Sequence, residues 1–134
     1  HYLPMAARSD VVYKFVSSVL AKQFFYIAMD PYGNAFNAGP TGAHYAPDHS
    51  GQTDWQWERK YEVDSLCFPV DLAWQLWKET GRTEHLTDAV HRGAAGIVKI
   101  WRLEQHHEEQ SGYRFERDAT RRQRRWLVGV WEHL

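Results

Sequence analysis

The chain has little cysteine and no excess of either charge. Cys67 is the single cysteine among 134 residues, which excludes an internal disulfide and a cysteine-based zinc site. Its place among apolar residues predicts a small buried thiol. The 16 basic residues are balanced by 17 acidic ones. Proteins that bind nucleic acid or an anionic membrane usually carry a clear basic excess, so we expect neither partner from the overall charge.

Long apolar runs and a leader segment are also missing from the sequence. No run approaches the ~20 apolar residues that a membrane-spanning helix needs, so no transmembrane segment is expected. The first residues, HYLPMAARSD, lack the basic start and apolar centre of a signal peptide. Because the chain begins with His1 and not with methionine, we expect a piece of a longer protein, and its compartment and oligomeric state are not assigned.

Familiar catalytic motifs are absent as well. There is no nucleophile motif of the G-x-S-x-G type, no phosphate-binding glycine loop and no nucleotide fingerprint. Two histidine pairs, His44 with His49 and His106 with His107, could be read as metal ligands. Neither pair has the i, i+4 spacing of a zinc-binding helix. We therefore expect solvated histidines, no metal and no cofactor.

The pattern that is present is helical. Ser9 or Asp10 can cap a first helix, the Asp30-Pro31 pair ends it, and Gly81 is a suitable carboxyl-terminal cap for a second helix. Apolar spacing then predicts long helices from 9 or 10 to about 29, from 64–69 to 81, and from 84 or 88 to about 108. No segment predicts a convincing strand. The predicted fold class is all-α, in one domain.

The second of these helices is apolar on most sides. One stripe holds Leu66, Val70, Ala73 and Trp77, and a neighbouring stripe holds Pro69, Leu72 and Leu76. This pattern is typical of an interior helix, and three helices cannot cover so wide an apolar surface, which again indicates missing neighbours. Pro69 fits only in the first turn or at a kink.

A long loop separates the first two helices. Residues 30–54 contain four glycines and three prolines and show no period of helix or strand. Its first part, DPYGNAFN, sets Tyr32 and Phe36 beside Asn34, a mixture that suits a sugar, which has polar edges and apolar faces. Alternatively, Asn34 simply follows Gly33 in a tight turn. Residues 39–52 are expected to form a mobile surface excursion.

Glu62 and Asp64 form the most suggestive carboxylate pair. In an extended segment they would stand about 6.6 Å apart, from a rise of ~3.3 Å per residue. Inverting glycosidases separate their two carboxyl groups by ~6.5–9.5 Å. However, two carboxylates on one segment would stand on the same side of a substrate. The alternative is that Asp64 caps the helix while Glu62 pairs with Arg59 or Lys60, and we favour substrate binding over proton transfer for both.

The end of the chain is rich in arginine and tryptophan. Five arginines lie between Arg117 and Arg125, next to Trp126. Such a cluster can bind RNA, but with a neutral overall charge it is more typical of a solvated face or an irregular chain end. We therefore divide the sequence into a domain at 1–118 and an atypical tail at 119–134, which resembles the end of a truncated or frame-shifted gene.

Several motifs together carry a resemblance to a known family. The segments YLPMA, DPYGNAFN, WERKYEVDSLCFPVDLAWQLWKETG and WRLEQHHEEQSGYRF, in that order, resemble glycoside hydrolase family 125, the metal-independent exo-α-1,6-mannosidases. The resemblance runs from Tyr2 to Phe115 and implies part of an (α/α)6 toroid. It further implies an inverting enzyme that removes terminal α-1,6-linked mannose from an oligosaccharide or glycan without a metal.

The resemblance also assigns residues. It makes the following side chains candidates for mannose binding: Asn34, Trp57, Glu58, Arg59, Lys60, Glu62 and Asp64. The general acid and base of the family lie beyond the position of Phe115, so no catalytic residue is expected within this chain, with Asp64 and Glu62 as the alternative. The chain alone is expected to be inactive. A non-catalytic carbohydrate-binding or interaction module is the alternative function, and an RNA-binding tail a third.

Overall fold

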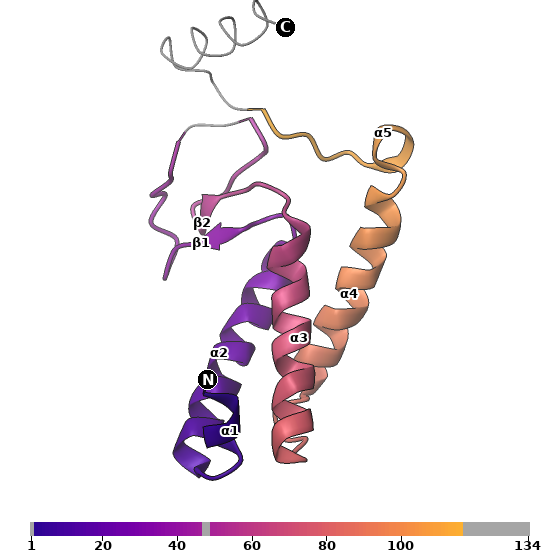
Figure 1. Ribbon diagram of the computed structural model, residues 1–134. Coiled ribbons are helices and arrows are strands. Elements are labelled where there is room, and N and C mark those ends of the chain that lie inside the picture. Colours follow the sequence, from indigo (N-terminus) through magenta and orange to yellow (C-terminus); the bar gives the residue numbers. More distant parts are fainter. Residues whose placement is uncertain (1, 47–48, 117–134) are drawn as a thin grey trace, which may run out of the picture.

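The computed structural model describes residues 2–46 and 49–116 and confirms the all-α class. Three long helices stand side by side, with a small sheet at one end (Figure 1). The elements, in chain order, are α1 (Leu3–Ala6), α2 (Asp10–Met29), β1 (Ala35–Phe36), β2 (Gln56–Glu58), α3 (Val63–Thr80), α4 (Asp88–Glu104) and α5 (His107–Gln110). The atypical tail at 119–134 lies outside the described residues.

The ends of the long helices follow the capping signals. Ser9 caps α2, its hydroxyl accepting a hydrogen bond from the amide of Val12 at 3.5 Å. Gly81 ends α3 in the left-handed conformation, with φ of 68°, which glycine adopts without steric cost. Thr87 caps α4. The predicted boundaries of α2 and α3 are thus confirmed. The third helix ends earlier than predicted, at Glu104, and the one-turn helix α5 follows it.

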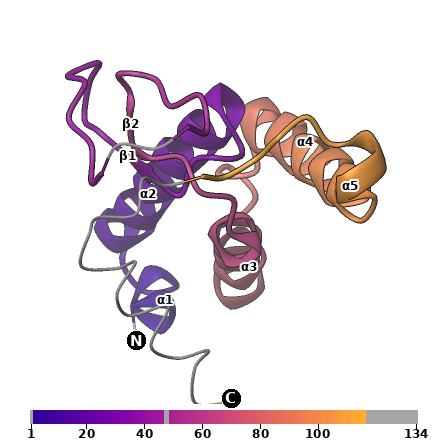
Figure 2. The ribbon, with the colours of Figure 1, turned by 90° about the horizontal axis from the view of Figure 1, so that it is seen from above.

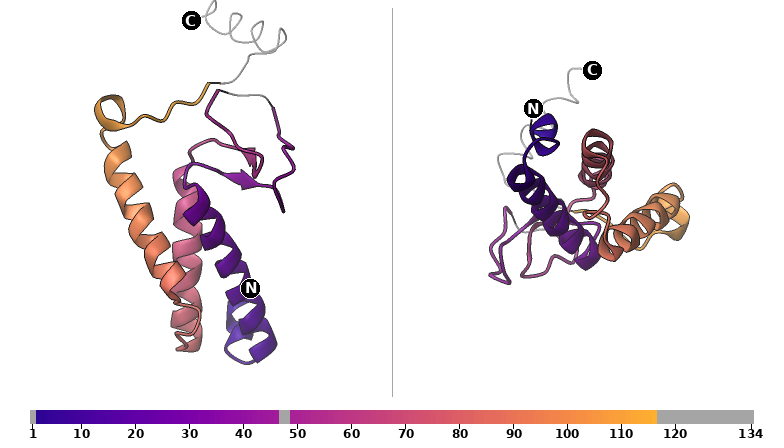
Figure 3. Two further views of the ribbon diagram at one scale, coloured as in Figure 1. Left: turned by 180° about the vertical axis from the view of Figure 1, so that it is seen from behind. Right: turned by 90° about the horizontal axis from the view of Figure 1, so that it is seen from below.

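The helices alternate in direction. In Figure 1, α2 and α4 run toward the sheet and α3 runs away from it. The view from behind shows the same three directions (Figure 3). Seen from above, the three axes occupy the corners of a triangle (Figure 2). Helix α2 packs against both α3 and α4, and α1 packs against α2 and α3. The sheet, α5 and the amino-terminal end of α3 therefore gather at one end of the bundle.

The core lies between the facing sides of the long helices. Its buried apolar residues are Ala6, Tyr13, Val16, Leu20, Phe24, Leu66, Ala73, Leu76, Val90 and Ile97. Burial on most sides of α3 was wrong for the described part of the chain, because only one face is covered. Phe68, Trp74 and Trp77 are 64%, 51% and 45% exposed. Cys67 is half-buried and not fully buried. The predicted shortage of neighbours agrees with these exposed aromatic side chains.

Two details of the helices also differ from the sequence reading. Pro69 lies in the second turn of α3 and not in the first. Residues 3–6 form the short helix α1, where a plain loop was expected.

The absence of strands was also wrong. β1 and β2 pair antiparallel, with Ala35 opposite Glu58 and Phe36 opposite Gln56. The strands are two and three residues long, and their register shifts between the two pairs. Elements this short have no detectable period, so their pairing comes from contacts between segments far apart in the sequence.

Helix α2 contradicts the expectation that no segment is long and apolar enough to span a membrane. By length and composition it could cross a membrane, since its most apolar window has a mean hydropathy of 1.2. The expectation that no run approaches this length was therefore too strict. Only 22% of that window is buried, yet α2 packs against three other helices. Core helices of globular proteins pass the same test, so this is weak evidence for a membrane.

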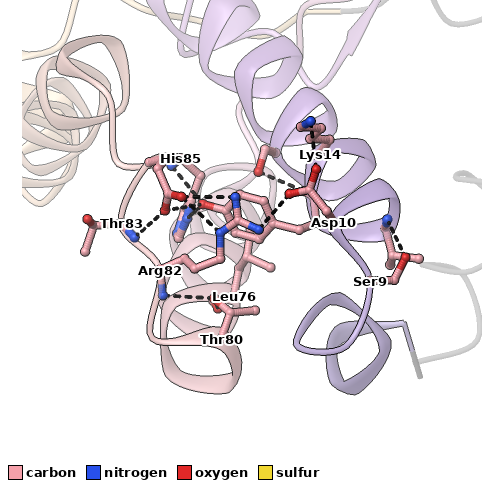
Figure 4. Close-up of polar contacts among 12 residues, drawn as sticks. Ser9, Asp10, Lys14, Leu76, Thr80, Arg82, Thr83 and His85 are labelled. Carbon is pink, nitrogen blue, oxygen red and sulfur yellow. Dashed lines mark hydrogen bonds and ion pairs between the residues drawn. The ribbon is translucent and has the colours of Figure 1, made fainter.

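At the other end of the bundle, a polar corner ties the start of α2 to the turn between α3 and α4 (Figure 4). Arg82 Nη1 lies 2.9 Å from Asp10 Oδ1, and its guanidinium covers the ring of Tyr13 at 3.5 Å. His85 is buried there, with Nε2 at 2.9 Å from the carbonyl of Ala73. Because a carbonyl only accepts, Nε2 donates to it, and Nδ1 lies 2.9 Å from the Tyr13 hydroxyl.

Candidate functional site

The seven candidate sugar-binding residues all lie at the sheet end of the bundle. Asn34 directly precedes β1, whereas Trp57 and Glu58 belong to β2. Arg59 and Lys60 follow in the connection to α3. Glu62 is the residue before α3, and Asp64 lies in the first turn of that helix. The pairing of β1 with β2 thus brings Asn34 next to candidates that lie up to thirty positions later in the sequence.

Asn34 is the residue that joins the two halves of this site. Its side-chain Nδ2 donates to Glu58 Oε2 at 2.7 Å, and its Oδ1 accepts from the backbone amide of Lys60 at 3.2 Å. Its own amide donates to the carbonyl of Glu58 at 3.3 Å. These contacts bind the DPYGNAFN loop to the approach segment 55–62. Asn34 is therefore more than the turn residue of the alternative reading.

Arg59 is held apart from the other candidates. Its Nε lies 2.6 Å from Asp30 Oδ2, and its Nη1 donates to the carbonyl of Ser50. The guanidinium also lies over the rings of Tyr32 and Tyr113, at 5.2 and 5.3 Å from their centroids. Cation–π contacts of this kind add to the ion pair in a half-buried place. Arg59 thus has a structural role in the described chain.

Sequence reasoning missed Gln56, which is almost fully buried below the site. Its Nε2 donates to Asp30 Oδ2 at 2.7 Å, and its Oε1 accepts from the amide of Thr53 at 2.9 Å. Asp30 therefore binds two donors from the approach segment. A glutamine beside tryptophans in a charged stretch gives no signal of burial, so only the fold identifies it.

The remaining candidates are more exposed. Glu62 Oε1 forms an ion pair with Lys60 Nζ at 2.8 Å, as the structural alternative predicted. Asp64 Oδ1 accepts from the amide of Ser65 at 3.0 Å, but the cap position itself is occupied by Glu62, so the predicted cap role of Asp64 was wrong. Trp57 is 42% exposed. The two carboxylates stand two residues apart on one segment, and each has a partner of its own.

A cavity opens next to Asn34, between α2, α3 and the sheet, and we call it the amide pocket. Its volume is about 280 Å³. It is lined by Gln23, Tyr26, Ile27, Gly33, Asn34, Phe36, Ser65, Phe68 and Pro69. The lining combines amide and hydroxyl groups with aromatic rings, the mixture that the sequence suggested for a sugar. Among the candidates, Asn34 alone lines it.

A buried carboxylate forms a second polar cluster that sequence reasoning missed. Glu104, whose side chain is 7% exposed, ends α4. Its Oε1 accepts from Tyr32 at 2.7 Å and from Ser111 at 2.6 Å, and its Oε2 accepts from His107 Nδ1 at 2.6 Å. Burial raises the pKa of Glu104, but the three hydrogen bonds outweigh this and bring it below its ordinary value. Burial, and then the bond to Glu104, raise the pKa of Tyr32 to about 12.

The histidines considered as metal ligands are dispersed. His44 Nδ1 contacts the carbonyl of Gly42 at 3.0 Å, while His107 belongs to the Glu104 cluster. His106 lies 3.8 Å from Glu109, in an exposed position. Within residues 2–46 and 49–116, no three histidine, cysteine or acidic side chains gather as a metal site.

The chain is similar to known proteins over most of its length. It matches the family described as metal-independent alpha-mannosidase (GH125) over residues 1–129. A solved structure of such an enzyme from Streptococcus pneumoniae, a non-productive substrate complex with α-1,6-mannobiose, is 40% identical to it. The TM-score is 0.83, and the match covers 90% of this chain and 28% of that one. No curated protein matches the chain.

Proposed function

Because the chain belongs to the family of metal-independent α-mannosidases, we propose that it supplies part of the mannose-binding site of an inverting exo-α-1,6-mannosidase. The observation that carries this proposal is the position of Asn34. Its amide is fixed by Glu58 and by the backbone of Lys60, next to a cavity of about 280 Å³. Fixed amides and charged groups on one rigid platform suit the paired hydroxyls of a sugar.

The carboxylates support binding more than catalysis. Hydrolysis with inversion needs an acid and a base on opposite faces of the scissile bond. Glu62 is engaged by Lys60 and Asp64 by the first turn of its own helix, and the two carboxylates belong to one short segment. The proposal therefore places the general acid and base outside this chain, in line with its span of 28% of the related structure.

The test compares two proteins, the 134-residue chain and the same chain extended by its flanking coding sequence. We expect only the extended protein to hydrolyse α-1,6-mannobiose. Because the reaction inverts the anomeric carbon, NMR that resolves the anomers should show β-mannose as the first product. Equal activity of the short chain would place the catalytic carboxylates within it and return Asp64 and Glu62 to that role. Mannobiose binding without hydrolysis by either protein would support the non-catalytic carbohydrate-binding module instead.

A further inference from the structure

We infer that the amide pocket binds one pyranose ring of the glycan, with Gln23 and the backbone carbonyl of Ser65 accepting hydrogen bonds from its hydroxyls. This inference rests on the proposed function, that the chain binds a mannose-containing sugar. It adds residues of α2 and α3 to a site that had been placed on the loop and the approach segment.

The first argument is an unsatisfied polar atom. Gln23 lines the pocket, and its Oε1 is buried without a hydrogen-bond partner among the described residues. A buried acceptor without a partner costs the free energy of its lost hydration, so such atoms are uncommon in folded proteins. The terminal torsion of glutamine is broad, so the amide of Gln23 can rotate while the rest of the side chain stays in place. A hydroxyl can meet either end of the amide, because it both donates and accepts.

The second argument comes from the proline inside α3. Pro69 lies four residues after Ser65, and both residues line the pocket. Since proline has no N–H, it cannot donate the helical hydrogen bond to the carbonyl of Ser65. The carbonyl of Ser65 thus lacks its usual helical donor, and it belongs to a residue that lines the cavity. Two acceptors that lack their usual donors favour a ligand that is rich in hydroxyl groups.

The third argument is the unused capacity of Asn34. A side-chain amide has two N–H donors and two lone pairs on its oxygen. The contacts with Glu58 and Lys60 use one donor and one lone pair. One donor and one lone pair are left on a side chain whose position is already fixed. Neighbouring hydroxyls of a pyranose, one accepting and one donating, match this pair.

The walls and the size of the cavity also fit a single ring. Tyr26 and Phe36 stack with their centroids 4.5 Å apart, and they form an apolar wall. Phe68 lines the same pocket and adds a third aromatic ring to its wall. A volume of about 280 Å³ is at the small end of the range for ligand pockets, which starts at roughly 300 Å³. We therefore assign one ring and not a longer oligosaccharide.

The test is calorimetric titration of the chain with α-1,6-mannobiose and with methyl α-mannoside. Gln23→Leu and Phe68→Ala should each weaken binding about tenfold, the equivalent of one lost hydrogen bond or ring contact. Trp74→Ala is the matched control for Phe68, because Trp74 is also an exposed aromatic residue of α3 but does not line the pocket. It should bind like the wild type.

Thermal unfolding separates this inference from a purely structural role. Gln23→Leu removes an unsatisfied buried acceptor, so its melting temperature should rise while its affinity falls. If the wild type binds mannobiose and both variants bind equally well, the pocket assignment is overturned while the proposed function stands. If the wild-type chain binds neither sugar, the proposal that it carries a sugar site fails, and the pocket assignment fails with it.

Discussion

Arg59 Nε lies 2.6 Å from Asp30 Oδ2, which joins the approach segment to the residue that ends α2. The two side chains are only 18% and 19% exposed. Arg59 is also one of the residues that the family resemblance assigns to mannose binding. A substitution there therefore changes the scaffold as well as any sugar contact, and its effect on activity must be read against its effect on stability.

Arg59→Met should lower the free energy of unfolding by about 2 kcal/mol, because it leaves the half-buried Asp30 carboxylate without its cation. Urea denaturation at neutral pH measures this loss. The matched control is Lys60→Met, since the ion pair between Lys60 and Glu62 is more exposed and should contribute less than about 0.5 kcal/mol. Similar losses for both variants would show that the Arg59–Asp30 contact does not stabilise the fold.

Glu104→Gln should lower the free energy of unfolding by about 2–3 kcal/mol at neutral pH, since the wild-type carboxylate accepts three hydrogen bonds while buried. The pKa of Glu104 is lowered in the folded state, so its stabilising effect is present above the ordinary value of 4.5 and is lost as the pH falls through the folded pKa. Denaturation curves from pH 7 to pH 3 should show the two proteins converging at low pH. A constant difference over that range would contradict this assignment.

Tyr32→Phe tests the same cluster from the alkaline side. The folded-state pKa of Tyr32 is raised from 10.0 to about 12, so its contribution is complete below pH 10 and is lost as the pH rises toward 12. The wild type should lose stability over this interval relative to the variant, as measured by denaturation at fixed pH steps. Parallel profiles would mean that the tyrosine hydroxyl is not bound to Glu104 in solution.

Two glycines of α4 should respond in opposite ways to alanine. A Cβ at Gly93 would lie 2.5 Å from Cδ1 of the buried Phe24, so Gly93→Ala should destabilise the fold by about 1–3 kcal/mol. At Gly96 no described atom lies within 4 Å of an added Cβ, apart from the backbone of its own helix and its chain neighbours. Gly96→Ala should therefore stabilise the helix by about 1 kcal/mol. Thermal unfolding of both variants decides this, and a gain at Gly93 would rule out the close α2–α4 approach.

The helical part of the fold could be predicted because its signals are local. Ser9 and Gly81 act within one turn of their own helices, so capping alone placed those ends. The burial of α3 could not be predicted in the same way. Its apolar residues are on most sides, but which of them are covered depends on the helices that stand beside it, and Phe68 and Trp74 are left exposed.

Candidate site residues could be named from the sequence only where they stand in a recognisable motif. Asn34 was proposed from the resemblance, and its contacts with Glu58 and Lys60 are now visible. Gln56 and Glu104 carried no signal of burial, because one partner of each lies far away in the sequence: Asp30 precedes Gln56 by 26 residues, and Tyr32 precedes Glu104 by 72. Such contacts follow from the packing of whole elements and not from any pattern within one segment.

The contact between Tyr13 and His85 has a consequence for the order of folding. It spans 72 residues, whereas the contact between Asn34 and Glu58 spans 24. The entropy lost on closing a loop grows with the logarithm of its length, so the longer loop costs about 1 kcal/mol more. The loop and the approach segment can therefore meet early, and the corner that buries His85 is expected to close late, once α3 and α4 have docked on α2.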